Sequence, residues 1–204
     1  MKKTLLAVAA LCAMTSGAAM AQQQDGKWQV RVRALHLNSS NGGSTNPDLN
    51  LSVNDKWMPE LDISYYFTPN FAAELILTYP QKHDIRAAGD KIGSLKHLPP
   101  TLLAQYHFTN FGAFKPYVGA GINYTRFSSV KWEPAVQPQN PSVKKNSWGG
   151  ALQVGFDYAL DKNWSINFDV KKVYIDTDVS LGGNKIGNFK VDPVLVGVGV
   201  GYRF

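Results

Sequence analysis

Apolar residues recur at every second position in eight segments between Trp28 and Phe204, and this period constrains the fold more than any other feature of the chain. The last segment shows it most clearly, because one face holds Val194, Val196, Val198, Val200, Tyr202 and Phe204. Successive side chains of a β-strand point to opposite sides, so a period of two predicts strands with one apolar face. Downstream of the N-terminal segment no run of about 18 apolar residues occurs, which excludes membrane-spanning helices. The sequence therefore predicts an all-β protein.

The connections between these segments decide between a soluble sheet and a membrane barrel. A soluble β-sandwich also alternates, so the period alone does not show whether the outer face meets water or lipid. Here short connections (68–70, 109–115 and 159–163) alternate with long ones (Asn38 to Met58, Pro80 to Lys96, Ser128 to Asn146 and Asp176 to Lys190). Outer-membrane barrels have this asymmetry, with tight periplasmic turns and long surface loops.

Aromatic residues gather at the ends of the segments, as in the interfacial belts of membrane barrels. Near the short turns lie Trp28, Phe67, Phe71, Phe108, Tyr158, Trp164 and Phe204, and near the long loops lie Tyr79, Tyr124, Phe127, Trp148 and Tyr174. We therefore predict an eight-stranded antiparallel transmembrane β-barrel in the cell outer membrane, in contact with its lipid and lipopolysaccharide. An even strand number places both termini in the periplasm, and closure of the sheet satisfies every strand edge. Lys172 departs from the pattern, so it either reaches the outer interface or marks a bulge.

The N-terminus predicts an export signal over residues 1–21, followed by a barrel over 22–204. Lys2 and Lys3 precede an apolar run, and Ala19-Met20-Ala21 matches a cleavage site. Removal of this segment lowers the formal charge from +6 to +4 and takes away Cys12, the only cysteine. The remaining cations are scattered among acidic residues, which does not favour nucleic-acid binding. No cysteine-based metal site or disulfide is expected, and we predict no cofactor.

The face opposite the lipid separates by height into a polar and an apolar part. A polar plug is predicted in the middle and periplasmic half from Arg31, Asp62, Glu74, Gln105, His107, Asp157, Asp169 and Arg203. A hydrophobic lumen is predicted from mid-barrel outward from Leu35, Leu37, Ile76, Leu103, Val173 and Leu195. An eight-stranded barrel is only wide enough for its own side chains or one small ligand, so an open aqueous pore is not expected.

Several segments resemble the OmpW family of outer-membrane proteins over nearly the whole mature length. The resemblance rests on residues 54–65, 96–106, 116–124 and 174–178, of which the Leu-Pro-Pro-Thr-Leu stretch at 98–102 is the most specific. The terminal Gly-Tyr-Arg-Phe is shared by many outer-membrane barrels and indicates recognition of Phe204 by the assembly machinery. The resemblance implies a barrel with a narrow apolar lumen that passes small hydrophobic molecules across the outer membrane.

Three prolines suggest where such a molecule would leave the barrel. Pro99 and Pro100 lie opposite Pro80, and proline removes hydrogen bonds from a β-ladder. Our hypothesis is that a solute enters from outside, meets the polar plug and exits sideways into the lipid through a gap at these prolines. The alternative is that the prolines only end the pairing at the rim.

Other functions receive less support from the sequence. Catalysis requires a nucleophile, a base and an orienting group held together, and nothing places Ser64, Ser165 and His107 side by side, so we predict no enzyme. The four histidines are too dispersed in the sequence to predict a metal site. The competing function is a non-transporting surface barrel for adhesion, stress or defence, or a receptor for phage or bacteriocins. The identity of the solute and the oligomeric state are left open by the sequence.

Overall fold

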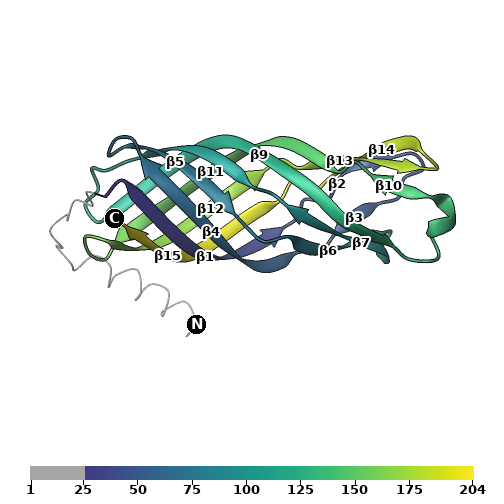
Figure 1. The fold of residues 1–204 in the computed structure, drawn as a ribbon, viewed down its shortest axis with the longest axis horizontal. Coiled ribbons are helices and arrows are strands. Elements are labelled where there is room, and N and C mark those ends of the chain that lie inside the picture. Colours follow the sequence, from purple (N-terminus) through teal and green to yellow (C-terminus); the bar gives the residue numbers. More distant parts are fainter. Residues whose placement is uncertain (1–25) are drawn as a thin grey trace, which may run out of the picture.

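The computed structural model describes residues 26–204 and shows a closed barrel of eight antiparallel strands (Figure 1). These strands are β1 (Trp28–Asn38), β4 (Lys56–Tyr66), β5 (Phe71–Leu77), β8 (Thr101–His107), β9 (Phe114–Trp132), β11 (Asn146–Ala159), β12 (Trp164–Val173) and β15 (Val194–Arg203). Each pairs with the next in this order, and β15 returns to β1. The predicted barrel and its strand number are confirmed. The predicted signal peptide, residues 1–21, lies outside the described residues.

The barrel continues beyond its long connections as a two-sheet extension, which we did not predict. Where loops were expected, the chain forms β2 (Gly42–Thr45), β3 (Leu51–Val53), β6 (Gln81–Ala87), β7 (Asp90–Leu98), β10 (Pro141–Val143), β13 (Asp176–Leu181) and β14 (Asn184–Lys190), with a 3₁₀ turn η1 (Gln137–Gln139). One sheet has the order β9-β7-β6-β3 and the other β10-β13-β14-β2. Because β9 is 19 residues long, it runs past the end of β8 and offers its free edge to β7. The opposite end of the barrel, with the short connections, is here called the turn end.

Alternation sorts the side chains of the barrel between two environments, as predicted. In β1, Arg31 and Arg33 are fully buried, whereas Val32 is 53% exposed on the outer face. Glycines of β15 make room for the two arginines: a Cβ at Gly199 would lie 2.1 Å from the carbonyl oxygen of Val32, and one at Gly201 would lie 3.2 Å from Cγ of Arg31. A larger residue at either position would therefore displace the wall or the arginines.

Lys172 reaches out of the lipid-facing row without a bulge. It pairs in regular register with Leu152 and Val194, and its ammonium donates hydrogen bonds to the hydroxyl of Ser40 and the carbonyl of Asp192. Of the two explanations considered from the sequence, the structure therefore shows a long side chain that carries its charge to the polar interface. The described residues contain no helix that is long and apolar enough to span a membrane.

Candidate functional site

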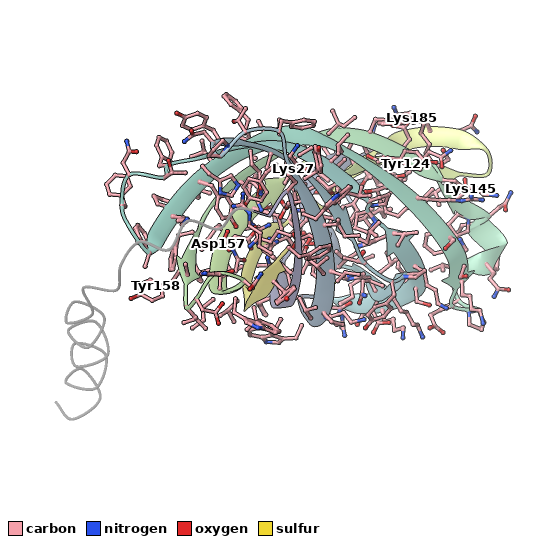
Figure 2. The ribbon with its side chains drawn as sticks, turned by 60° about the vertical axis from the view of Figure 1, so that its left-hand side comes forward. Lys27, Tyr124, Lys145, Asp157, Tyr158 and Lys185 are labelled. Atoms are coloured by element: carbon pink, nitrogen blue, oxygen red, sulfur yellow. The ribbon has the colours of Figure 1, made fainter. Side chains whose placement is uncertain are left out.

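Ionisable side chains from five strands meet inside the half of the barrel nearer the turn end and form what we call the ion cluster. Its cations are Arg31, Arg33 and Lys171, and its carboxylates are Glu60, Asp62, Glu74, Asp157 and Asp169. None of these eight residues is more than 3% exposed. Figure 2 shows Asp157 within the barrel, with its neighbour Tyr158 on the outside. Side chains buried to this degree fill the bore and leave no open aqueous channel along its axis.

The two arginines hold the ion cluster together because alternation places them one above the other on β1. The guanidinium of Arg31 lies 3.0 Å from Asp62 and 2.8 Å from Asp157. That of Arg33 lies 2.8 Å from Glu60 and 2.7 Å from Glu74. Each cation contacts two or more carboxylates, so the planar, multidentate geometry of arginine links opposite walls of the barrel.

The structure brings together seven of the eight residues predicted for the polar plug. Gln105 donates to Gln153 at 2.8 Å, Gln153 donates to Asp169 at 2.7 Å, and Nε2 of His107 lies 3.1 Å from Oε1 of Gln105. Arg203 lies apart at the turn end, where its guanidinium stacks 3.6 Å from the centre of the Tyr66 ring and donates to the carbonyl of Gly26.

Three members of the ion cluster were missing from the prediction. Arg33, Glu60 and Lys171 lie one step outward of Arg31, Asp62 and Asp169, with the same strand parity. Parity therefore could have identified them as lumenal. The polar part of the lumen therefore extends two positions further along each of these strands, toward the extension, than we predicted from the sequence.

A narrow neck lies directly above the ion cluster, and its lining is apolar apart from Glu60, Thr78, His97, Thr101, Asn123 and Lys171. All six residues predicted for the hydrophobic lumen are buried in one apolar cluster. Four of them line the neck: Leu37, Ile76, Val173 and Leu195. The volume open to the centre of a water-sized sphere is about 20 Å³, and Glu60 and Lys171 form the floor. Because one water requires about 10–15 Å³ by this measure, the neck admits little more than one small group at a time.

A wider chamber lies above the neck, between the two sheets of the extension. Its volume by the same measure is about 90 Å³. The lining is apolar apart from His97, Gln139 and Thr177, and includes Val53, Ile85, Leu95, Phe127, Val179 and Phe189. A space of this size and lining suits a small apolar molecule, since ligand sites are concave and mostly hydrophobic. The predicted lumen omitted this chamber because its walls belong to segments that were read as loops.

The barrel wall has a seam beside the neck. The β5–β8 ladder ends at the pair Ile76 and Thr101, and pairing resumes only at Gln81 and His97 between β6 and β7. Within the described chain, no ladder pair joins residues 77–80 to residues 98–100. Pro80, Pro99 and Pro100 all lie in this seam, and Pro99 and Thr78 line the neck.

On the side away from β5, Pro99 and Pro100 are hydrogen-bonded to β9. The backbone N–H of Tyr124 donates to the carbonyl of Pro100 at 3.1 Å, and the side-chain amide of Asn123 donates to the carbonyls of Pro99 and Pro100 at 3.2 Å each. The prolines are thus held to β9, while the side that faces β5 lacks ladder hydrogen bonds. The seam is therefore the weakest line in this part of the wall.

Two histidines that are 14 positions apart in the sequence meet beside the seam, a proximity that the sequence did not predict. His83 and His97 stack with ring centroids 4.6 Å apart, because the β6–β7 hairpin places them on one face. No group of three possible metal-ligating residues occurs in the part of the chain that the structure describes. His36 instead packs against Trp57 on the outer face.

The comparisons with known proteins agree with this architecture. Residues 24–204 match the OmpW family. The chain belongs to the OmpW family. It is 36% identical to outer membrane protein W of Escherichia coli K12 over the full length of both chains, and 49% identical to the uncharacterized outer-membrane protein y4mB of Sinorhizobium fredii over 87% of this chain and 80% of that protein. This OmpW-family protein is thus an outer-membrane barrel.

A solved structure and a more distant relative extend the comparison. The crystal structure of the outer membrane protein OprG from Pseudomonas aeruginosa superposes with a TM-score of 0.79 at 29% identity, covering 91% of this chain and 99% of that chain. The dibenzothiophene metabolism operon protein PahQ of Pseudomonas aeruginosa is 25% identical over 85% of this chain and 77% of that protein. The family and the fold are those of outer-membrane barrel proteins.

Proposed function

We propose that this protein passes small hydrophobic molecules from the cell exterior into the outer membrane and does no catalysis. The extension faces outward and the turn end faces the periplasm, with both termini on the periplasmic side. A solute enters the chamber, descends into the neck and leaves sideways through the seam into the lipid. The assembly machinery recognises Phe204, which lies exposed at the turn end.

One observation carries this proposal: the apolar path ends on the ion cluster at the level where the wall is unpaired. A hydrophobic solute gains nothing from entering a region of buried charges, because those charges would lose partners to make room for it. The seam, by contrast, joins the neck to hydrocarbon. The relative PahQ supports this assignment, since its name refers to dibenzothiophene, an apolar aromatic molecule.

The prolines provide the test of the sideways exit. Replacing Pro99 and Pro100 together by valine supplies two backbone N–H donors, which lets the ladder extend across the seam. We expect uptake of radiolabelled n-octane to fall from the wild-type rate toward the rate of cells carrying an empty vector. The host would lack its own OmpW-family gene, and outer-membrane levels of each variant would be matched by immunoblot.

Pro59→Val is the matched control, because Pro59 lies within the continuous β1–β4 ladder on the outer face. It should leave octane uptake unchanged. Wild-type uptake in the Pro99→Val/Pro100→Val variant would contradict the sideways exit. Equal uptake with wild-type protein and with empty vector would contradict transport as a whole and favour a surface role for the extension.

A further inference from the structure

Buried polar atoms without partners cluster around the upper part of the seam. Among the described residues they include Oγ1 of Thr78, Oε1 of Gln81, Nε2 of His83 and Nε2 of His97. Gln81, His83 and His97 are each at most 2% exposed. His97 lines both the chamber and the neck, and Thr78 lines the neck. Since almost all buried polar groups in proteins are hydrogen-bonded, a group of such atoms beside an apolar cavity points to a ligand.

The hydrogen bonds that these residues do make show that two of the free atoms are acceptors. Nδ1 of His83 lies 3.1 Å from the carbonyl oxygen of Asn54, which can only accept, so Nδ1 carries the proton. In the neutral ring Nε2 is then an acceptor. Likewise, the side-chain amide of Gln81 donates to the carbonyl of Tyr79 at 3.0 Å, which leaves Oε1 as an acceptor. These two atoms therefore require a hydrogen-bond donor. Nε2 of His97, the one of the three residues that lines the cavities, donates or accepts according to the tautomer of the ring, and a hydroxyl can meet either form.

The histidines do not provide a positive charge at this place. They lie in the extension, outside the membrane-spanning part of the strands. Burial lowers the pKa of His97 to about 3 and also lowers the pKa of His83. Both rings are thus neutral at physiological pH. The charge of Lys56 further lowers the pKa of both rings, and its ammonium donates to the backbone carbonyl of Lys82. A carboxylate would therefore find no cation to balance its charge at these rings. A hydroxyl can donate a hydrogen bond to a free ring nitrogen and carries no charge.

We propose that the chamber and neck bind amphiphiles that carry a single hydroxyl, such as phenols and aliphatic alcohols, with the apolar body in the chamber and the hydroxyl at His97. This inference rests on the proposed function and specifies its substrate class. His97 marks the point where the chamber narrows, so a molecule held there has its polar end at the neck. The chamber then accepts apolar groups of different shape, while the hydroxyl of the amphiphile fixes its orientation.

The test compares two fluorescent probes that differ by one hydroxyl, 1-naphthol and naphthalene, with the full-length mature protein in lipid nanodiscs. Binding is measured by fluorescence, with protein-free nanodiscs as the correction for partition into lipid. We expect 1-naphthol to bind about fivefold more tightly than naphthalene, which corresponds to one net hydrogen bond. His97→Leu should abolish this preference and leave naphthalene affinity unchanged.

Two further variants separate recognition from folding. His97→Gln keeps a polar head group and should retain most of the preference, whereas His36→Leu changes a histidine on the outer face and should have no effect. A preference for 1-naphthol that survives in His97→Leu, or equal binding of both probes to the wild type, would overturn this inference alone. Failure of both probes to bind would instead overturn the chamber as a solute site, and the proposed function with it.

An independent observation concerns the outer surface of the same region, where a row of cations lies just outward of the aromatic belt. Lys82 and Lys96 are direct cross-strand partners on β6 and β7, and both are exposed. Arg126 of β9 pairs with Leu98 and Asn146, and Lys145 immediately precedes Asn146, the first residue of β11. Like charges directly opposite each other destabilise a sheet. In the described part of the chain, the ion pairs of the extension involve Lys91 and Lys185 and none of these four cations.

Three of the four cations lie close in sequence to an aromatic residue of the outer belt, which is on their membrane side. Tyr79 lies three positions from Lys82, Tyr124 two positions from Arg126, and Trp148 three positions from Lys145. Figure 2 shows Tyr124 and Lys145 toward the extension. Aromatic belts mark the headgroup level, so the cations lie at the height of the phosphates of the outer leaflet.

We infer that this basic row binds the phosphates of lipopolysaccharide. The triple variant Lys82→Gln, Lys96→Gln, Arg126→Gln should bind bisphosphorylated lipid A more weakly than wild type, by roughly fivefold per cation removed. The measurement is native mass spectrometry of protein in neutral-lipid nanodiscs with added lipid A. The control triple Lys91→Gln, Lys185→Gln, Lys190→Gln should bind as wild type.

Two ligand arms identify the source of the phosphate. Lipid A without phosphates should bind equally weakly to wild type and to the triple variant. Inorganic phosphate at the same concentration should not compete with lipid A. Effective competition by inorganic phosphate would overturn the assignment to a lipid headgroup, and unchanged lipid A binding by the triple variant would overturn the basic row as the site.

Discussion

Replacing Arg33 by leucine should lower the free energy of unfolding by about 3–5 kcal/mol, because removal of one partner leaves buried carboxylates uncompensated. Arg33 lies within 3.1 Å of Glu60, Asp62, Glu74 and Asp169, all of them buried. Leucine fills part of the space but neutralises none of these charges. The measurement is urea unfolding of the mature protein in lipid vesicles, followed by tryptophan fluorescence.

Two controls distinguish loss of the ion cluster from loss of any arginine. Arg86→Leu removes an exposed arginine of the extension and should change the unfolding free energy by less than about 0.5 kcal/mol. Arg33→Lys keeps the charge but not the planar fork, so its effect should fall between those of the other two variants. If Arg33→Leu were as stable as Arg86→Leu, the charges would not be coupled as the structure indicates.

The ion cluster is also the reason that the proposed solute path turns sideways. A fully apolar bore would allow a hydrophobic solute to continue along the axis toward the periplasm. Here the interior nearer the turn end is bridged by ion pairs, in which arginines of β1 contact carboxylates on β4, β5, β11 and β12. Charges held in this way resist rearrangement, since every displacement exposes an unpaired group. The same cluster thus closes the axis and stiffens the wall beneath the seam.

Strand parity predicted the barrel well because one rule applies to every residue of a two-sided sheet. It placed Arg31 and Asp62 in the lumen and Val32 in the lipid, and the structure agrees. Height within the lumen was harder to predict, because it depends on how far each strand is shifted against its neighbours. Glu60 and Lys171 meet at 2.7 Å although they are 111 positions apart, and only the closed register brings them to the same level.

The extension was not predicted because its turns and irregular pairings interrupt the alternation. The β6–β7 hairpin turns through Ala88 and Gly89, both with positive φ, and the β13–β14 hairpin turns through Gly182 and Gly183. Segments of this kind read as loops when only composition is considered. The stacked histidines were missed for the same reason, since they become neighbours only when that hairpin forms. The chamber that we propose as the solute site therefore depends on the least regular part of the sequence.

Filling the chamber should abolish most of the uptake of hydrophobic solutes. Val179 on β13 is 4% exposed and lines the chamber, so Val179→Trp places an indole in the space that a solute would occupy. If the indole keeps two methylenes of the solute out of the chamber, binding weakens by about 1.6 kcal/mol, and the affinity of the chamber for the solute falls more than about tenfold. We expect n-octane uptake to fall in proportion, measured in the same cells as the proline variants.

The barrel offers a control with the identical substitution on its other face. Val198 on β15 is 51% exposed toward the lipid, so Val198→Trp adds the same side chain without entering the path. Because an indole suits lipid contact better than a buried wall, an unfolding measurement on both variants is needed to show that Val179→Trp still forms the barrel. Octane uptake at the wild-type rate in a folded Val179→Trp protein would mean that solutes bypass the chamber. A fall in uptake for Val179→Trp with none for Val198→Trp would assign the path to the interior of the extension.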